Sequence, residues 1–346
     1  MQTLTLTGAN GVSDIHIENG LFDRAAALML EVFSPSRVHI VTDSNVAPHY
    51  LAALEGQFSL PVSHTIIPAG EEHKRLSTVE GIYHDLLAAG MTRKDLIIAL
   101  GGGVVGDITG FAAATFLRGV SLCQMPTTLL AQVDSSVGGK TGVDLPEGKN
   151  LVGAFYQPRL VLIDPKTLAT LPDETFIDGM AEVVKYGYIA NPAILDMVSQ
   201  PDYHDNIENI IYECVKIKRD VVAIDEHDTG LRMILNFGHT VGHAAEKLGN
   251  YTDLTHGQAV AIGMVAAARL SAMRGNADLT APLARLLEQI GLPTELTYDR
   301  EAIFGALLSD KKKFGGTVNF ILVREAGRAE ITPIDANALH EYLLKL

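Results

Sequence analysis

A glycine-rich turn between two apolar segments constrains the fold of this 346-residue chain more than any other feature. Residues 95–100, DLIIAL, run directly into GGGVVGDITGFAAATFLRG at residues 101–119. Gly101, Gly103 and Gly106 match the pattern G-x-G-x-x-G, whose backbone N–H groups at the start of a helix can hold a pyrophosphate. The pattern alone occurs by chance in flexible loops, but a strand before it and a helix after it are the context that nucleotide binding requires. The sequence therefore predicts a nucleotide-binding α/β fold in the first half.

Polar residues follow other predicted strands of the same half. The β-branched run at residues 37–42 ends at Asp43 and Asn45, and the loop at residues 68–80 offers Glu71 and Lys74. An acidic residue that binds a ribose is usual about 20 residues beyond the glycines of a dinucleotide-binding fold. Residues 123–125, which stand there instead, are Cys, Gln and Met. Asp43 is therefore the candidate ribose anchor.

The segment MPTTLLAQVDSSVGGKTGVDLPEGKN at residues 125–150 is polar and glycine-rich within an otherwise apolar half. Because it lacks a clear periodicity, we expect a long loop, and such loops are usually functional. Its lysines, its asparagine and its paired glycines suit a phosphate-bearing ligand. The candidate residues in this segment are Thr127, Thr128, Asp134, Lys140, Lys149 and Asn150.

Length and charge limit the class of protein. A chain this long favours two domains of about 150 to 200 residues, since single cores rarely grow larger. Strand patterns give way to helical periodicity near residue 164, so we expect an α/β domain over residues 1–163 and a mostly α-helical domain over residues 164–346. A net charge of −14 excludes broad contacts with nucleic acid, which require a basic face. An anionic substrate would need a few local lysines and arginines.

The protein is expected to be soluble and cytoplasmic. Its first residues alternate like a β-strand and show neither the basic nor the apolar region of a signal peptide. No apolar run approaches the ~20 residues that a membrane span needs. Cys123 and Cys214 lie in apolar segments, which suits packing roles in a reduced compartment.

Titratable residues recur at helical spacing in the second half. Residues 173–189 are predicted to form a helix on which Glu182 and Lys185 share a face. A second helical segment, residues 213–228, carries Lys218. A third helix, over residues 231–248, is expected to present four polar residues on one face at successive turns, namely Arg232, Asn236, His239 and His243. Near the C-terminus, residues 307–331 are expected to end a helix at three lysines, normally a solvated run, and then to form a hairpin.

His239 and His243 are four residues apart, as in the HExxH motif of zinc peptidases, but Thr240 stands where that motif requires glutamate. The pair could therefore bind a metal, transfer protons or form a buried polar stripe. His256 begins a further apolar helix. Together with Glu182, the three histidines suggest a catalytic zinc, which takes three protein ligands and leaves a fourth position open. Four candidates exceed three places, so one histidine is expected to remain for proton transfer.

Four segments closely resemble the 3-dehydroquinate synthase family of the shikimate pathway, and the resemblance covers nearly the whole chain. They lie at residues 101–119, 125–155, 179–187 (GMAEVVKYG) and 235–244 (LNFGHTVGHA). The resemblance implies a Rossmann-like NAD-binding α/β domain, a mostly α-helical metal-binding domain, Zn²⁺ or Co²⁺ in the cleft between them, and a homodimer. The implied substrate, 3-deoxy-D-arabino-heptulosonate 7-phosphate, carries a carboxylate and a phosphate, which fits local bases on an acidic chain.

The resemblance also implies roles for individual residues. The implied metal ligands are Glu182, His239 and His256. The implied NAD contacts are Asp43, Asn45, Glu71, Lys74, Gly102, Gly103, Val104, Asp107, Thr127, Thr128, Leu130, Lys140 and Lys149. The implied catalytic residues are Asp134, Lys185, Lys218, Asn236 and His243, and the implied substrate contacts are Lys140, Asn150, Arg232 and Lys311, with Arg118 entering from a second subunit. Asp228 departs from the family pattern, in which glutamate is expected.

The implied reaction is redox-neutral. The C5 alcohol of the substrate is oxidised transiently, phosphate is eliminated from C7, and C5 is reduced again. Ring opening and aldol closure then give 3-dehydroquinate and phosphate, so that NAD is not consumed.

Three other classes fit parts of the pattern. Cyclases that make 2-deoxy-scyllo-inosose or 2-epi-5-epi-valiolone use the same cofactors, but their substrates lack a carboxylate, and Arg232, Asn236 and Lys311 favour a substrate that has one. A metal-dependent glycerol or alcohol dehydrogenase would accumulate NADH from a simple polyol. A non-catalytic NAD-binding module would have no use for the set of metal ligands.

Overall fold

The computed structural model describes residues 1–8, 11–311 and 317–345, and the side chains of residues 309–311 lie outside the described part. The chain forms two compact units. The first comprises Met1–Pro172 and Cys214–His227, and the second comprises Asp173–Glu213 and Asp228–Leu346. Helix α7, Ile207–Ile224, therefore contributes to both units. The expected boundary between an α/β domain over residues 1–163 and a mostly helical domain over residues 164–346 stays a prediction.

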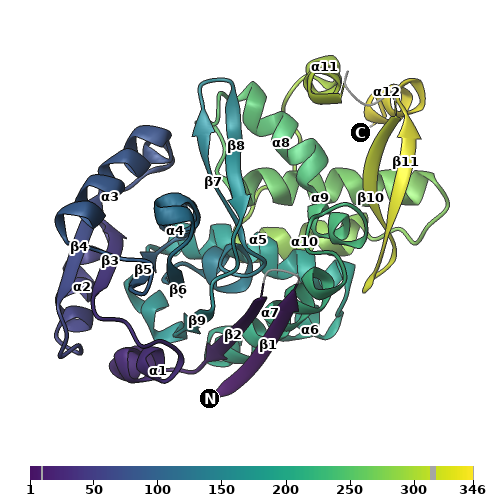
Figure 1. Ribbon diagram of the computed structural model, residues 1–346. Coiled ribbons are helices and arrows are strands. Elements are labelled where there is room, and N and C mark those ends of the chain that lie inside the picture. Colours follow the sequence, from purple (N-terminus) through teal and green to yellow (C-terminus); the bar gives the residue numbers. More distant parts are fainter. Residues whose placement is uncertain (9–10, 312–316, 346) are drawn as a thin grey trace. The chain divides into compact units, whose positions relative to one another are not determined.

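A seven-stranded sheet forms the centre of the first unit (Figure 1). Its spatial order is β1-β2-β9-β6-β5-β3-β4. The strands are β1 (Gln2–Gly8), β2 (Gly11–Ile17), β3 (Val38–Asp43), β4 (Val62–Ile67), β5 (Leu96–Gly101), β6 (Ser121–Pro126) and β9 (Leu160–Ile163). The hairpin β1–β2 is antiparallel, and the other neighbours pair in parallel. Continuous apolar runs such as LIIALG in β5 suit parallel strands, because both of their faces are buried.

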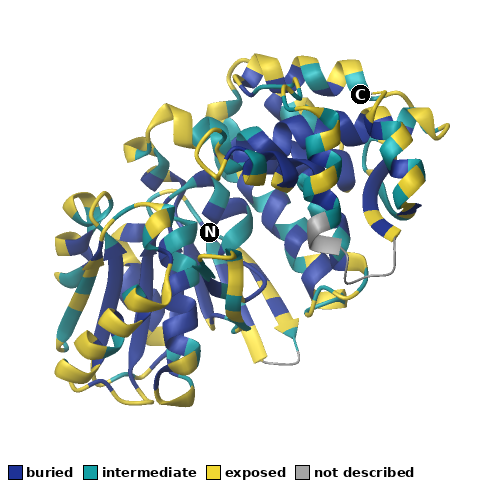
Figure 2. Ribbon diagram, turned by 90° about the horizontal axis from the view of Figure 1, so that it is seen from above, coloured by how far each residue is buried: buried dark blue, intermediate teal, exposed yellow. Residues whose placement is uncertain are grey.

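Helices cover both faces of this sheet. On one face, α1 (Ala25–Val32) and α2 (Ala47–Glu55) share a core with alternate residues of β3, β5, β6 and β9. On the other face, α3 (Leu76–Ala88) and α4 (Gly103–Thr115) pack on the remaining residues. Figure 2 shows the central strands of the sheet buried and the outer sides of the helices exposed. The predicted β–α units at residues 37–42 and 95–119 are confirmed.

The expectation of an irregular loop over residues 125–150 is wrong in part. After β6 the chain forms a short π-helical turn, Ala131–Ser135, and then the hairpin of β7 (Lys140–Leu145) and β8 (Gly148–Phe155). The two hairpin strands approach closely at Gly142, where a Cβ would lie 2.7 Å from the carbonyl oxygen of Val152. Glycines at this contact remove the alternating apolar pattern by which a strand is recognised.

The described part of the second unit is mostly helical, as expected. Its helices are α5 (Asp173–Ile189), α6 (Ala193–Val198), the first turns of α7, α8 (His239–Leu248), α9 (His256–Met273), α10 (Thr280–Ile290), α11 (Arg300–Lys311) and α12 (Ala336–Leu343). The predicted hairpin is confirmed as β10 (Thr317–Glu325) and β11 (Arg328–Asp335). This hairpin shares an apolar core with α8, α9, α11 and α12 (Figure 1).

One predicted helix is broken. Residues 231–248 do not form a continuous helix, because a 3₁₀ helix, Leu231–Asn236, ends before α8 begins at His239. Gly238 has a φ of 84°, a left-handed conformation that no right-handed helix contains. Arg232 and Asn236 therefore do not continue the face of α8 that carries the two histidines.

Cys123 and Cys214 are both buried and unbridged, as their apolar surroundings predicted. Within the described ranges, every helix is either too short or too polar to cross a bilayer. The core of each unit is thus built from ordinary apolar packing between helices and strands.

Candidate active site

The first unit places the glycine-rich turn at the carboxyl edge of its sheet. β5 ends at Gly101 and α4 begins at Gly103, so the amino end of α4 faces this edge. β3 and β5 are neighbours, and β4 and β6 lie on their outer sides, which makes this pair the topological switch point where such sheets bind ligands. A Cβ on Gly102 would lie 2.9 Å from Cγ2 of Thr128, so glycine lets the turn approach the segment after β6. A pyrophosphate would fit this turn and accept hydrogen bonds from the first backbone N–H groups of α4.

The other predicted cofactor residues lie at the same edge of the sheet or beside it. Oδ1 of Asp43, at the end of β3, accepts the backbone N–H groups of Asn45 at 2.8 Å and Val46 at 3.0 Å. The segment after β4 carries Glu71 and Lys74. Three further candidates lie in the first turns of α4, namely Gly103, Val104 and Asp107. Three more follow β6, namely Thr127, Thr128 and Leu130. The structure thus brings together segments that are far apart in the sequence.

Lys74 connects several of these segments. Its buried Nζ lies 2.7 Å from Oδ2 of Asp107, 3.9 Å from Oε1 of Glu71 and 2.6 Å from Oδ1 of Asn150. Burial disfavours the charged ammonium, but Asp107 and Glu71 outweigh this effect and raise the pKa of Lys74. Asn150 has a φ of 55°, and its backbone N–H donates to Oδ1 of Asp144 at 2.6 Å. A charged lysine therefore joins the cofactor edge to the β7–β8 hairpin.

Two predicted catalytic residues meet in the same unit. Nζ of Lys218, on α7, donates to the backbone carbonyl of Asp134 at 2.8 Å and also forms an ion pair with the carboxylate of Asp134. The side chain of Lys218 is buried. Lys140 begins β7, and Lys149 lies in β8.

Arg118 lies in a strained turn after α4. Its φ is 65° and that of the preceding Leu117 is 50°. Positive φ is uncommon for residues other than glycine, and two in succession require support from the surrounding structure. The turn holds Arg118 at the surface of the first unit.

In the second unit, packing of α5 against the start of α9 joins Glu182 to His256. Asp178, one turn before Glu182, accepts the N–H of Gly257 at 2.7 Å and the hydroxyl of Thr255. Thr255 also caps α9 through a capping box. A Cβ on Gly257 would collide with the carbonyl of Asp178, so glycine is needed for this close approach. These contacts fix His256 at the first position of α9, with Nε2 3.0 Å from Oε1 of Glu182.

Close packing of α8 on α9 brings His239 to the same place. A Cβ on Gly242 would lie 2.7 Å from the carbonyl oxygen of Ala259, so any larger residue would separate the two helices. As a result, Nε2 of His239 lies 3.4 Å from Oε1 of Glu182, and its ring centre is 5.3 Å from that of His256.

The cluster of Glu182, His239 and His256 fits a divalent cation. One ligand atom from each lies within 4.8 Å of the others. Nδ1 of His239 is 3.2 Å from the carbonyl oxygen of Phe237, which can only accept, so Nδ1 carries the proton and the lone pair of Nε2 faces Glu182. These two electron-rich atoms repel each other unless a cation lies between them. Two imidazoles and a carboxylate are also the donor set of a catalytic zinc.

The charges of the cluster support this interpretation. Burial favours the neutral acid, but Lys185 and His239 hold the pKa of Glu182 well below its ordinary value. The second carboxylate oxygen of Glu182 forms a buried ion pair with Lys185. Burial lowers the pKa of His239, whereas at His256 two carboxylates outweigh burial and raise the pKa to about 10. Glu182 is therefore charged and His239 neutral, as metal ligands must be, whereas His256 would have to give up a proton on binding a metal.

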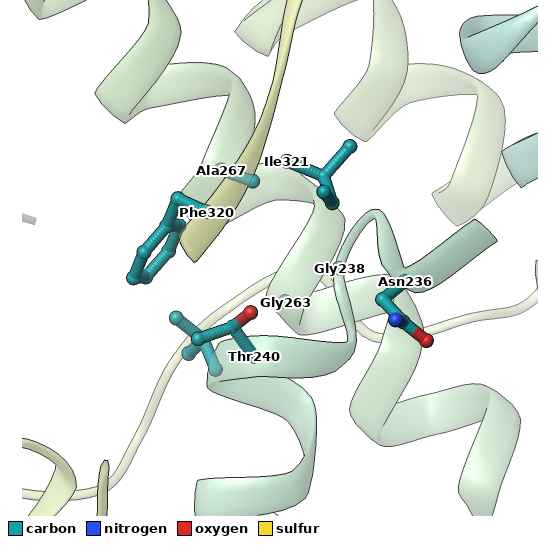
Figure 3. A pocket seen from close by; sticks show the side chains of 8 residues that line it. Asn236, Gly238, Thr240, Gly263, Ala267, Phe320 and Ile321 are labelled. Carbon is teal, nitrogen blue, oxygen red and sulfur yellow. The ribbon is translucent and has the colours of Figure 1, made fainter. Parts of the chain in front are cut away.

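A pocket of about 650 Å³ in the second unit borders this cluster. Asn236, His239 and His243 line it, and β10 contributes Thr317 and Asn319. Figure 3 shows an adjoining pocket, which is lined by Asn236 and Thr240 together with Phe320 and Ile321. The side chain of His243 is 57% exposed, and its ring centre is 5.2 Å from that of His239. His243 therefore has access to a ligand in the pocket.

The remaining predicted residues of this unit differ in their surroundings. Arg232 is 2% exposed and lies in the 3₁₀ helix that precedes α8. Asp228 lines the pocket and has a φ of 59°. Lys311 is the last residue of α11, and its side chain lies outside the described residues.

Sequence comparison identifies the family. A family model described as 3-dehydroquinate synthase N-terminal matches residues 64–178, and one described as 3-dehydroquinate synthase C-terminal matches residues 179–313. A curated protein of Pelobacter propionicus named 3-dehydroquinate synthase is 44% identical over 352 residues, and the match covers 98% of each chain. The chain belongs to the 3-dehydroquinate synthase family.

Two solved structures of related cyclases have the same fold. One is 2-deoxy-scyllo-inosose synthase complexed with carbaglucose-6-phosphate, NAD⁺ and Co²⁺, which is 28% identical with a TM-score of 0.86 over 99% of each chain. The other is 2-epi-5-epi-valiolone synthase from Streptomyces hygroscopicus with NAD⁺ and Zn²⁺, which is 26% identical with a TM-score of 0.84 over 96% of each chain. The predicted class, a Rossmann-like α/β part followed by a mostly helical part, is confirmed.

In this member of the 3-dehydroquinate synthase family, three polar residues near the cluster were not predicted from the sequence. Thr317 and Asn319 line the pocket from β10, and their position depends on the packing of the hairpin against α8 and α9. Glu246 lies buried beside His243 and His256. Its spacing of three residues from His243 was the only local signal for its position.

Proposed function

We propose that the protein catalyses the second step of the shikimate pathway, converting 3-deoxy-D-arabino-heptulosonate 7-phosphate to 3-dehydroquinate and phosphate. The observation that carries the proposal is the cluster of Glu182, His239 and His256 in a chain that is 44% identical to a 3-dehydroquinate synthase. The reaction is a phosphate-eliminating cyclisation, so the enzyme would be a carbon–oxygen lyase. The reaction needs both a nucleotide and a Lewis acid. The first unit offers the glycine-rich turn for the nucleotide, and the second offers the cluster of Glu182, His239 and His256 for the metal.

Glu182, His239 and His256 would hold Zn²⁺ or Co²⁺, and the carboxyl edge of the sheet would hold NAD. Two related cyclases were solved with NAD⁺ and with Co²⁺ or Zn²⁺. When bound, NAD supplies reversible hydride acceptance, and the metal supplies Lewis acidity toward adjacent substrate oxygens. Residues 1–163 would thus serve the nucleotide, and residues 164–346 would serve the metal and substrate. The proposed NAD contacts are Asp43, Asn45, Glu71, Lys74, Gly102, Gly103, Val104, Asp107, Thr127, Thr128, Leu130, Lys140 and Lys149.

The chain's own side chains would orient the substrate and move protons. His243 would exchange a proton with the substrate, since its ring is exposed at the pocket and is not needed as a ligand. Asn236, which lines the same pocket, would orient a substrate oxygen. Lys185 would keep Glu182 charged through their buried ion pair, and Lys218 would hold the carboxylate of Asp134 in place through another.

Basic residues would bind the two anionic ends of the substrate. Arg232 offers a planar guanidinium that can bind a carboxylate or phosphate through two hydrogen bonds. The other proposed substrate contacts are Lys140, Asn150, Lys311 and Arg118. We also propose a cytoplasmic homodimer in which Arg118 reaches the substrate of the second copy. The strained turn that holds Arg118 at the surface supports this role.

A second candidate is a sister cyclase, because the 2-deoxy-scyllo-inosose synthase structure matches with a TM-score of 0.86. Its 28% identity is well below the 44% identity to the Pelobacter propionicus protein, which favours the carboxylate-bearing substrate.

Phosphate release separates the two candidates. The purified protein with NAD and Zn²⁺ would be given the heptulosonate phosphate, glucose 6-phosphate and sedoheptulose 7-phosphate in turn. We expect phosphate release from the heptulosonate phosphate alone. Equal or faster release from either neutral sugar phosphate would assign the protein to the sister cyclases.

A further inference from the structure

Glu246 is a carboxylate in the second unit that the proposed reaction does not use. It lies on α8, and its side chain is only 4% exposed. Acidic side chains are almost never buried to this extent unless they have polar partners. Its position next to the proposed metal ligands suggests that those partners are histidines.

The carboxylate of Glu246 faces two histidines at once. Its Oε1 lies 3.8 Å from Nδ1 of His256, and its Oε2 lies 4.0 Å from Nε2 of His243. The opposite nitrogen of His256, Nε2, lies 3.0 Å from Oε1 of Glu182. The imidazole of His256 is therefore held between two buried carboxylates, one on α5 and one on α8.

His239 shows what an orienting partner does in this cluster. The carbonyl of Phe237 fixes its proton on Nδ1 and so directs the lone pair of Nε2 toward Glu182. At His256 the carboxylate of Glu246 occupies the equivalent place beside Nδ1. A carboxylate is a stronger acceptor than a carbonyl, so it would hold that proton more firmly.

We propose that Glu246 is a positioning residue that accepts the Nδ1 proton of His256 and so presents Nε2 of that ring to the metal. The inference rests on the proposed function, since it assumes that His256 is a metal ligand. The distance of 3.8 Å is longer than a hydrogen bond, so the ring of His256 or the carboxylate of Glu246 would have to move for the bond to form. Through its other oxygen, Glu246 also restrains His243, the proposed proton carrier.

The same atoms allow one competing role. His243, Glu246 and His256 also lie within 4.8 Å of one another and could hold a cation themselves. If both clusters were filled at once, the ring of His256 would have to bind one cation on each nitrogen, and such a ring carries no proton. The positioning role needs one cation and a neutral ring, so the geometry favours it, and metal stoichiometry distinguishes the two.

The test compares Glu246→Gln and Glu246→Ala with wild type, after circular dichroism has shown that each variant is folded. Zn²⁺ affinity would be measured by competition with a chromophoric chelator, and the ligand field by the visible absorption of the Co²⁺-loaded protein. Loss of an orienting partner typically weakens metal binding about 10- to 100-fold. We expect such a loss in both variants, a changed Co²⁺ spectrum, and partial recovery in Glu246→Asp.

Glu301→Gln is the matched control. Glu301 forms a carboxylate–histidine pair of the same kind with His340, 2.9 Å from its Nε2, but its side chain is 61% exposed. This variant should bind Zn²⁺ as tightly as wild type and give the same Co²⁺ spectrum. The control separates the position of Glu246 from the general effect of removing a carboxylate–histidine pair.

A measurement on the wild type stands even if the variants do not fold. Nitrogen-15 NMR of histidine-labelled, Zn²⁺-loaded protein should show His256 with a proton on Nδ1 that exchanges slowly with water. Ligation through Nδ1, or a rapidly exchanging Nδ1 proton, would overturn the inference. So would unchanged Zn²⁺ affinity in folded Glu246 variants, or two bound cations in wild type and one in Glu246→Ala. A wild type that binds no metal would instead overturn the proposed function.

Discussion

The two half-sites of the protein are built in different ways. In the first unit, the glycine-rich turn offers backbone N–H groups at the carboxyl edge of a parallel sheet, and Lys74 connects the surrounding segments. In the second unit, side chains from three helices converge, and the charged groups of Glu182 and Lys185 are fully buried. One half-site depends on the shape of the backbone, and the other depends on buried charge.

This difference predicts how strongly substitutions in each half-site should affect binding and activity. A change in the turn alters how closely a ligand approaches, so it should weaken binding gradually. Removal of one partner from the buried cluster leaves another charge uncompensated, which is far more costly. Substitutions should therefore reduce activity much more in the second half-site than in the first.

The largest effect is expected from His239→Ala. Without this ligand the protein should lose its metal and, with it, several kcal/mol of transition-state stabilisation, which is a rate loss of about 10³-fold or more. Metal content by atomic absorption and phosphate release would be measured on the same sample. A full equivalent of zinc in this variant would contradict the ligand assignment.

His243→Ala is the matched control, because it removes the neighbouring imidazole from the same helix. This variant should keep its metal and still lose about 10²- to 10⁴-fold in rate, as expected for a lost general acid or base. If it lost metal as His239→Ala does, the division of roles between the two histidines would be wrong.

The next largest effect should come from Arg232→Lys. The charge is kept but the planar fork is lost, and a charge-assisted hydrogen bond contributes about 1.5 to 3 kcal/mol, so kcat/KM should fall about 10- to 100-fold. A substrate analogue without the carboxylate would be compared on both proteins. If Arg232 binds the carboxylate, the analogue should lose much less affinity on the variant, and an equal loss on both would assign the carboxylate to another base.

A smaller effect is expected from Gly102→Ala in the first half-site. The added Cβ would meet the side chain of Thr128, and such crowding typically costs about 1 to 3 kcal/mol. NAD affinity, measured by fluorescence titration, should therefore fall about 10-fold or somewhat more. Metal content should not change, and loss of metal in this variant would show that the two half-sites are not built independently.

The smallest effect on activity concerns the core of the first unit. Burial lowers the pKa of His39 to about 4, and the ring is satisfied by Ser63 at 2.8 Å and Thr65 at 2.9 Å. Because the folded state binds this proton less tightly than the unfolded state, stability is fully present above about pH 6.5 and is lost as pH falls toward 4. Between pH 7.5 and pH 5 the loss from this group should be about 2 kcal/mol.

Urea denaturation of wild type and His39→Gln at these two pH values would measure this loss. The variant's deficit in free energy of unfolding should shrink by about that amount at the lower pH. If the difference in free energy of unfolding between wild type and His39→Gln did not depend on pH, the pKa of His39 would not be lowered by folding.

Each half contains features that the sequence predicted and features that it did not. The nucleotide edge was predicted because its strand, glycines and helix are contiguous, and their pattern is local. Glu182 and Lys185 were placed on one helical face for the same reason. By contrast, the break at Gly238 and the β7–β8 hairpin were not predicted, since glycines interrupt the periodicity on which both predictions relied. Glu246 was missed because its burial depends on α9, which lies later in the sequence.

We expect one redox-neutral reaction to use both half-sites, and simultaneous measurement of phosphate and NADH tests this expectation. The protein would be supplied with the heptulosonate phosphate, NAD and Zn²⁺, with and without a chelator. We expect steady phosphate release while the NADH concentration stays below the enzyme concentration. Phosphate release should stop when chelator is added and recover when the metal is restored. NADH that accumulates in step with product, or phosphate release that continues without metal, would contradict it.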